Sequence, residues 1–301
     1  LTPGSDDISP LLRKHRSAVE IALQERFERA IAEGDLPDQA NARDLALDLL
    51  TVFDGMAVRA AAGDNTGELR NIAQRALSAW TASLPASRTV PKSRDALVEE
   101  SRGRPRQFRR EDAVDAAIRV FWERGYDGAS MTDLTDAMGI TRSSLYAAFE
   151  SKQGLFLQAL DSYEEARLKI VREALDAPKV QDAVRALLDQ AVTVQCSPSG
   201  PRGCLMAVNA MQGSDEARMI RSEVLKRDRH LARLLASRIE RAQQERELAP
   251  DADTTGLTAH ILAILRGIIA GGHAGYDEGQ LRALTASFEN SWNKTLLPIS
   301  L

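Results

Sequence analysis

The chain has 301 residues, of which 44% are hydrophobic, and it carries a formal net charge of −4 with only two cysteines. This length exceeds one ordinary domain, so we expect two or three. The small negative charge argues against a protein that coats nucleic acid non-specifically, although a specific reader needs only local positive charge. Two cysteines cannot form a disulfide framework, and the first residues show no signal-like pattern, which favours a cytoplasmic location. The longest apolar stretch, 257–270, is interrupted by His260, Arg266 and Gly267, so we expect no membrane association.

The two ends of the chain resemble each other. Residues 13–84 align without a gap on residues 225–296, and 19 of the 72 aligned positions are identical. The identities include Gly55 with Gly267, Gly63 with Gly275, Leu69 with Leu281, Arg70 with Arg282 and Trp80 with Trp292. Divergence elsewhere speaks against a cloning duplication and for two related units joined head to tail. We therefore expect a helical half-domain at 1–87, whose start at Leu1 falls in a loop and suggests a truncated or fragmentary unit.

The segment between the two units has the composition of a linker. It is polar and interrupted by prolines, and its last part, residues 102–110, holds five arginines and no acidic residue. Such an arm can lie along DNA phosphates or enter a minor groove, which makes Arg102, Arg104 and Arg106 candidate DNA contacts. The alternative is a solvated linker with a run of charge. We assign the linker and basic arm together to 88–108.

Residues 132–152 have the pattern of a helix-turn-helix motif. The first helix carries Leu134, Ala137 and Met138 at helical spacing, and Gly139 ends it. The short distance from this glycine to the next helical pattern indicates a tight turn.

The second helix of this motif is expected from about 142 to 149. Either Thr141 or Ser143 can cap it. Its first residues, Arg142, Ser143 and Ser144, are polar, and three apolar residues are left to pack inward: Leu145, Ala148 and Phe149. In motifs of this kind the N-terminal residues of the second helix reach base edges in the major groove.

These residues resemble the TetR/AcrR family of transcriptional regulators. An amphipathic segment at 112–125, the link G-Y-D-G-A-S-M-T-D-L and the ending L-Y-A-A-F-E-S-K occur in the family's register. The resemblance implies an all-α fold, with a three-helix DNA-binding domain at 109–155 and a helical ligand-binding and dimerisation bundle at 156–301. It also implies that Tyr146 and Lys152 hold phosphates while Thr141, Arg142 and Ser143 face bases. The full set of DNA-binding candidates is Arg102, Arg104, Arg106, Thr132, Thr141, Arg142, Ser143, Ser144, Tyr146 and Lys152.

The second unit reads as nearly all helix from residue 153 onward. We expect helices at 154–175, 178–194, 204–211, 215–248, 254–270 and 277–292. The last two have apolar faces wider than one buried stripe requires, which indicates a bundle completed by a partner, as in the family's dimers. The predicted pairing residues are Leu257, Ile261, Leu265, Ile268, Leu281, Leu284, Phe288 and Trp292. The alternative is that these helices form the core of one large domain.

By the repeat, 1–87 resembles the C-terminal part of a second ligand-binding domain of this family. Two arrangements are open. The half-domain can dock on 215–301 of its own chain as a pseudo-dimer, or both units can pair with another copy across a two-fold axis.

No catalytic or metal-binding set stands out, and we expect neither an enzyme nor a bound metal or cofactor. Cys196 and Cys204 flank a Gly- and Pro-containing loop, and the residues around Cys204 are similar to a stretch in TetR relatives that sense electrophiles or copper. Arg202 and a helix start at Cys204 would both favour the reactive thiolate. The alternative is an inert buried thiol.

The combined prediction is a ligand-responsive regulator, most simply a repressor, that binds double-stranded operator DNA as a dimer. A palindromic operator would be released when an unknown small molecule binds or a cysteine is modified. The competing hypothesis is a non-DNA-binding helical assembly or adaptor protein with a vestigial helix-turn-helix.

Overall fold

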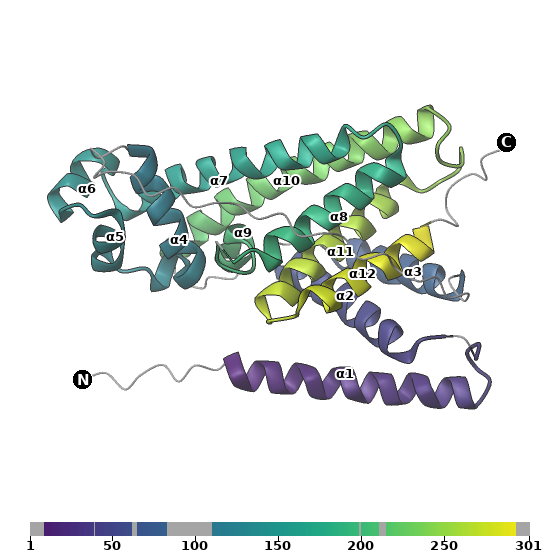
Figure 1. Ribbon diagram of the computed structural model, residues 1–301. Helices are drawn as coiled ribbons and strands as arrows, with labels where there is room; N and C mark the ends of the chain where they lie inside the picture. The colour runs from purple at the N-terminus through teal and green to yellow at the C-terminus, as the bar shows by residue number, and fades with distance from the viewer. Residues whose placement is uncertain are drawn as a thin grey trace.

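The computed structural model describes residues 9–38, 40–61, 65–82, 110–198, 200–210 and 215–292. These residues form twelve α-helices and no β-strand, which confirms the all-α prediction. The helices are arranged as a small head of three short helices at one end of the molecule and a long bundle that extends from it (Figure 1).

The head consists of three short helices that pack around aromatic residues. These are α4 (Arg110–Gly128), α5 (Met131–Met138) and α6 (Arg142–Phe149). The ring of Phe156, from the following helix α7 (Lys152–Leu175), meets Phe121 edge to face at 4.9 Å between centroids and Tyr126 at 5.3 Å. The helix α7 begins inside this core and continues into the bundle, so it contributes buried residues to both parts.

The bundle of the second unit contains α8 (Val180–Cys196), α10 (Asp215–Gln244), α11 (Thr254–His273) and α12 (Glu278–Trp292), with the short α9 (Leu205–Ala210) next to the head. The prediction placed the end of α10 four residues too late, because Arg246 turns the chain with φ 61°. It ended α11 too early, because the glycines at 271 and 272 stay helical. An apolar residue count alone cannot locate either end.

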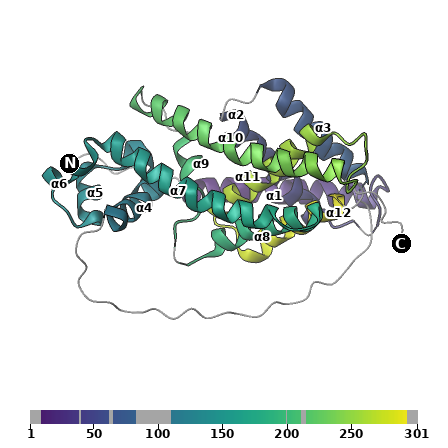
Figure 2. The same ribbon diagram turned by 90° about the horizontal axis from the view of Figure 1, so that it is seen from above.

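The N-terminal segment forms α1 (Ser9–Ala32), α2 (Ala42–Ala61) and α3 (Thr66–Ala82). Several of its helix bounds are equivalent, in the repeat alignment, to bounds in the second unit. The last residue of α1 aligns with the last residue of α10, and both ends of α2 align with the ends of α11. Even the turn after the first helix is equivalent, since Gly34 (φ 78°) matches Arg246. The helix α2 packs along α11, and α3 contacts α11 and α12 (Figures 1 and 2).

The helix α11 lies at the centre of the bundle. Its length and composition alone would allow it to cross a membrane, but 72% of its most apolar window is buried by the helices around it, as in a core helix. Six of the predicted pairing residues are likewise buried within this one chain: Leu257, Ile261, Leu265, Ile268, Leu281 and Leu284. The side chains of Phe288 and Trp292 lie outside the described residues.

Candidate nucleic-acid interface and internal pocket

Reciprocal capping fixes α5 in the head. The Ser130 hydroxyl accepts the Asp133 backbone N–H at 3.1 Å, and the Asp133 carboxylate accepts the Ser130 N–H at 3.0 Å. Arg124 of α4 pairs with the same carboxylate at 2.5 Å. At the other end of α5, Gly139 adopts φ 64°, the left-handed conformation that ends a helix without strain in glycine. These contacts set the angle at which the chain enters α6.

The helix α6 presents a polar surface to solvent. Of the two candidate caps, Thr141 fills the role: its hydroxyl accepts the Ser144 N–H at 3.2 Å, and the hydroxyls of Ser143 and Ser144 lie 2.9 Å from it. Leu145 and Phe149 are buried and anchor the helix from below. The candidates Thr132, Thr141, Arg142, Ser143, Ser144 and Tyr146 are all exposed.

The two alanines of the motif differ in environment. Ala148 is half-buried and packs against the core, as predicted, whereas Ala137 is exposed. The buried side chains of Leu134, Met138 and Leu145 fill the core beneath the two helices.

Aromatic rings orient the cations of the head. The Arg142 guanidinium lies 5.8 Å from the centroid of the Tyr146 ring, and the Lys152 ammonium lies 4.5 Å from that of Tyr126. Arg110 donates to the Ala148 carbonyl at 2.9 Å and so satisfies the C-terminal end of α6. Of the arginine run at 102–110, Arg102, Arg104 and Arg106 lie outside the described residues.

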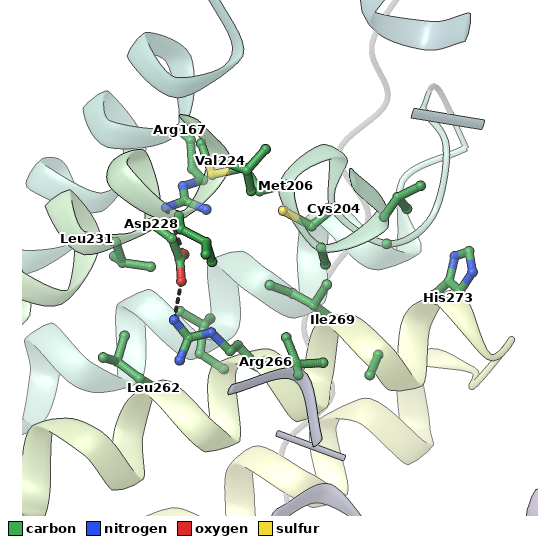
Figure 3. A pocket seen from close by; sticks show the side chains of 17 residues that line it. Arg167, Cys204, Met206, Val224, Asp228, Leu231, Leu262, Arg266, Ile269 and His273 are labelled. Atoms are coloured by element: carbon green, nitrogen blue, oxygen red, sulfur yellow. Dashed lines mark hydrogen bonds and ion pairs between the residues drawn. The ribbon is translucent and has the colours of Figure 1, made fainter. Parts of the chain in front are cut away.

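A cavity of about 330 Å³ lies behind the head, between α7, α9, α10 and α11 (Figure 3). Its wall is mainly apolar, with Met206, Val224, Leu231, Leu262 and Ile269 among the lining residues. Val58 of α2 also lines the cavity, so the N-terminal segment contributes to it.

One side of this cavity is charged. Arg266 of α11 forms an ion pair with Asp228 of α10, and Arg167 of α7 lies 3.5 Å from the other oxygen of the same carboxylate (Figure 3). Burial raises the pKa of Asp228, but the two guanidinium groups outweigh burial and hold it below its usual range. Arg167 Nε and Arg266 Nη1 are buried and find no hydrogen-bond acceptor among the described residues. The guanidinium groups of Arg167 and Arg266 therefore share the single carboxylate of Asp228, and each keeps an N–H group without an acceptor among the described residues.

The two cysteines differ in environment. Cys204 is buried on the cavity wall, and the Tyr163 hydroxyl donates to its sulfur at 3.3 Å. Cys196 is half-buried; burial, assisted by Glu278, raises its pKa and so disfavours its thiolate.

The cation predicted beside Cys204 was misassigned. Arg202 donates instead to the Tyr276 carbonyl at 3.3 Å, and the guanidinium that interacts with Cys204 belongs to Arg167. The loop itself is held by Gln195, which bonds both the N–H and the carbonyl of Gly203. The helix that follows Cys204 has only six residues.

A buried asparagine connects the cavity wall to the head. Asn209 of α9 accepts the Tyr126 backbone N–H at 2.7 Å and donates to the Leu205 carbonyl at 2.8 Å. Tyr126 follows the kink of α4 at Gly125, where φ is 69°. Since Met206, Ala207 and Val208 of α9 line the cavity, the same short helix contacts both the cavity and the kink of α4.

Sequence reasoning missed three of these residues. Arg110 was counted in the basic run but not as a site residue, although its place at the start of a helix was a usable signal. Asn209 is a polar residue in an otherwise apolar short helix, which is also a visible signal. Arg167 had none, because its partners Cys204 and Asp228 lie in the loop before α9 and on α10, and only the tertiary fold brings them together.

Comparison with known proteins agrees with this geometry. The family model "Bacterial regulatory proteins, tetR family" matches residues 113–159, and a model of a tetracyclin repressor-like C-terminal domain matches residues 181–296. Among solved structures, the chain is similar to the TetR family regulator CifR, a cysteine mutant complexed with 26-base-pair operator DNA: 35% identity, a TM-score of 0.58, and coverage of 63% of this chain and 98% of that one.

Curated relatives give the same result. The repressor ComR of Escherichia coli K12 is 31% identical over 202 residues, which are 65% of this chain and 94% of ComR. The repressor Rv1474c of Mycobacterium tuberculosis is 26% identical over 192 residues, 61% of this chain and 92% of the relative. An exposed helix-turn-helix head, a bundle behind it and relatives covered almost end to end lead to one assignment: the chain belongs to the TetR family and is a DNA-binding transcriptional regulator.

Proposed function

We propose that the chain is a repressor that binds a specific operator through α6 and releases it when an effector enters the internal cavity. The observation that carries the proposal is the direct path from cavity to head: α9 forms part of the cavity wall and holds the kink of α4 through Asn209. A ligand that fits better when this wall is displaced shifts the head away from its DNA-binding position.

Operator recognition is assigned to the exposed start of α6. Arg142 can donate two hydrogen bonds to one guanine. The hydroxyls of Thr141, Ser143 and Ser144 have a shorter reach to the bases, and Thr141 also caps the helix. Lys152 and Tyr146 are assigned to phosphate contacts, and the basic arm would add sequence-independent attraction.

The test is selection of duplexes from a random pool, followed by titration of variants. Arg142→Ala should relax base preference at one position by about 1–3 kcal/mol. Lys152→Ala should weaken all sequences alike and lower the salt slope by about one. If the unaltered chain enriches no sequence at moderate salt, the repressor proposal is wrong.

The cavity suggests an effector with an apolar body and one anionic group. The unpaired N–H groups of Arg167 and Arg266 can donate to a carboxylate, and the excess positive charge favours it over a neutral group of the same shape. A matched pair of probes, naphthalene-1-carboxylate and naphthalene-1-carboxamide, tests this. The acid should raise the melting temperature more than the amide, and Arg266→Gln should remove the difference. Equal shifts from both probes would contradict an anionic effector.

Cysteine modification is a second route to release. CifR was solved as a mutant with three substituted cysteines, two of them eight positions apart, the spacing of Cys196 and Cys204. Tyr163 and Arg167 both act on the Cys204 sulfur, and an added group there would enter the cavity. Alkylation should therefore release operator from the unaltered chain and from Cys196→Ser, but not from Cys204→Ser. Release from Cys204→Ser at an unchanged rate would remove Cys204 from the mechanism.

A further inference from the structure

The contact between α2 and α11 has the geometry of a two-fold interface although both helices belong to one chain. A Cβ atom on Gly55 would lie 2.0 Å from the Ala263 carbonyl oxygen, and one on Gly267 would lie 2.4 Å from the Thr51 carbonyl oxygen. By the repeat, Gly55 is equivalent to Gly267, and Thr51 to Ala263. The same contact therefore occurs twice with the roles exchanged, which is the signature of an isologous interface.

This contact is part of the main core and not an accessory one. Leu47, Val52 and Ile72 of the N-terminal segment belong to the same continuous apolar cluster as Leu262 and Ile264 of α11. The crossing glycines permit a backbone approach that no other residue type allows. The segment thus covers the face of α11 that a second subunit would otherwise need.

The supports of the two central helices are also equivalent. Arg16 of α1 forms an ion pair with Asp54 of α2, and at the equivalent positions Asp228 of α10 pairs with Arg266 of α11. The charges are exchanged, but the geometry of the pair is kept. The first unit therefore reproduces the fold of the second around this interface.

At the edges the two units have become complementary instead of identical. Arg75 of α3 donates to the Asp253 carbonyl at 2.7 Å, whereas the equivalent residues are Ser287 and Asn41. Arg16 donates to the Tyr276 hydroxyl at 3.0 Å and lies over its ring at 4.8 Å. The residue equivalent to Arg16 in the second unit is Asp228. If two second units paired, an aspartate would therefore face the tyrosine where the first unit provides an arginine. These contacts form only between a first and a second unit.

We propose that residues 9–82 replace the pairing helices of a second subunit within the same chain, and that they complete the effector cavity through Val58. Residues 83–109 tether the two units, so docking within the chain has a high effective concentration and outcompetes pairing with another copy. In this arrangement the 301-residue chain contains one pairing interface but only one DNA-reading head, whereas a dimer of two such heads has two.

The first test is the mass of the full chain in solution, measured by sedimentation equilibrium over a wide concentration range. A single species of 32.9 kDa is expected. A dimer that persists on dilution, whether it joins two second units or exchanges first units between chains, overturns the proposal. The measurement needs no DNA, so its outcome is independent of the operator-binding proposal.

The second test uses glycine variants. Gly55→Leu should undock the segment, lower the melting temperature and allow concentration-dependent dimers through the freed α11 face. Gly200→Leu is the matched control, because a side chain at Gly200 meets nothing within 4 Å. If both variants behave alike, the interface does not exist as described. Should Gly55→Leu not fold, the milder Arg75→Ser, which installs the residue of the second unit, replaces it.

The third test concerns the cavity. Val58→Trp fills it from the N-terminal segment, whereas Ala57→Trp on the exposed side of the same helix does not. The fluorescent probe 8-anilinonaphthalene-1-sulfonate should bind the unaltered chain and Ala57→Trp equally, and Val58→Trp at least ten-fold more weakly. Equal binding to both variants would show that the segment does not form part of the cavity.

Discussion

Asn209 is the residue whose replacement should most clearly separate the head from the bundle. Its side chain satisfies a buried backbone N–H of α4, and Asn209→Leu leaves that donor without a partner. We expect a loss of about 1–3 kcal/mol in the free energy of unfolding, together with weaker operator binding. Chemical denaturation and fluorescence anisotropy measure the two effects. The exposed Asn71→Leu is the control, and equal stability of both variants would refute the link.

His260 gives the bundle a pH dependence. Burial, with repulsion from Arg75, lowers its pKa from 6.5 to about 4. In the unfolded chain His260 is protonated below pH 6.5, whereas in the folded chain it stays neutral down to about pH 4. The free energy of unfolding is therefore highest above pH 6.5 and falls as the pH is lowered from 6.5 to 4. The loss reaches at most about 3 kcal/mol. Denaturation curves between pH 7 and 4 should show it, and His260→Gln should flatten the dependence; an unchanged slope in that variant would exclude His260 as the cause.

At the scale of elements, the repeat makes equivalent positions directly comparable. Leu265 of α11 is buried at 5% exposure, whereas its equivalent in α2, Phe53, is 66% exposed because the first unit lacks counterparts of α7 and α8 in the described chain. Leu265→Ala should therefore cost about 2–5 kcal/mol, and Phe53→Ala within about 0.5 kcal/mol. Thermal denaturation of the two variants compares them. A large loss for Phe53→Ala would mean that something covers this face in solution.

The same comparison shows what sequence could and could not predict. The repeat predicted a helical half-domain at 1–87, and the ends of α1 and α2 lie at positions equivalent to the ends of α10 and α11. In both copies a residue with positive φ, Gly34 or Arg246, follows the first of these helices. The head followed from capping residues and apolar spacing. The partners of Cys204 and the docking face of α2 depend on which helices meet, and periodicity in one helix does not encode that. Sequence left both docking within the chain and pairing between chains open.

The whole molecule should read DNA differently from a symmetric dimer. If α2 of the same chain covers the pairing face of α11, each chain brings one head to DNA. Such a chain should bind one half-site, and not both halves of the palindrome expected for a dimer. Hydroxyl-radical footprinting on a selected operator should show protection of a single major groove and its flanks. Two protected grooves one helical turn apart would require two paired chains and would contradict this expectation.

The glycine crossing of α2 and α11 also bears on how such a regulator behaves when it is scarce. A repressor assembled from separate subunits falls apart as its copy number drops, and its hold on the operator then declines with the square of concentration. Pairing helices carried on one chain cannot be diluted away from each other. Occupancy would then decline only in proportion to the number of molecules, so a cell could keep the gene silent with very few copies and would pass fluctuations in their number to transcription without amplifying them.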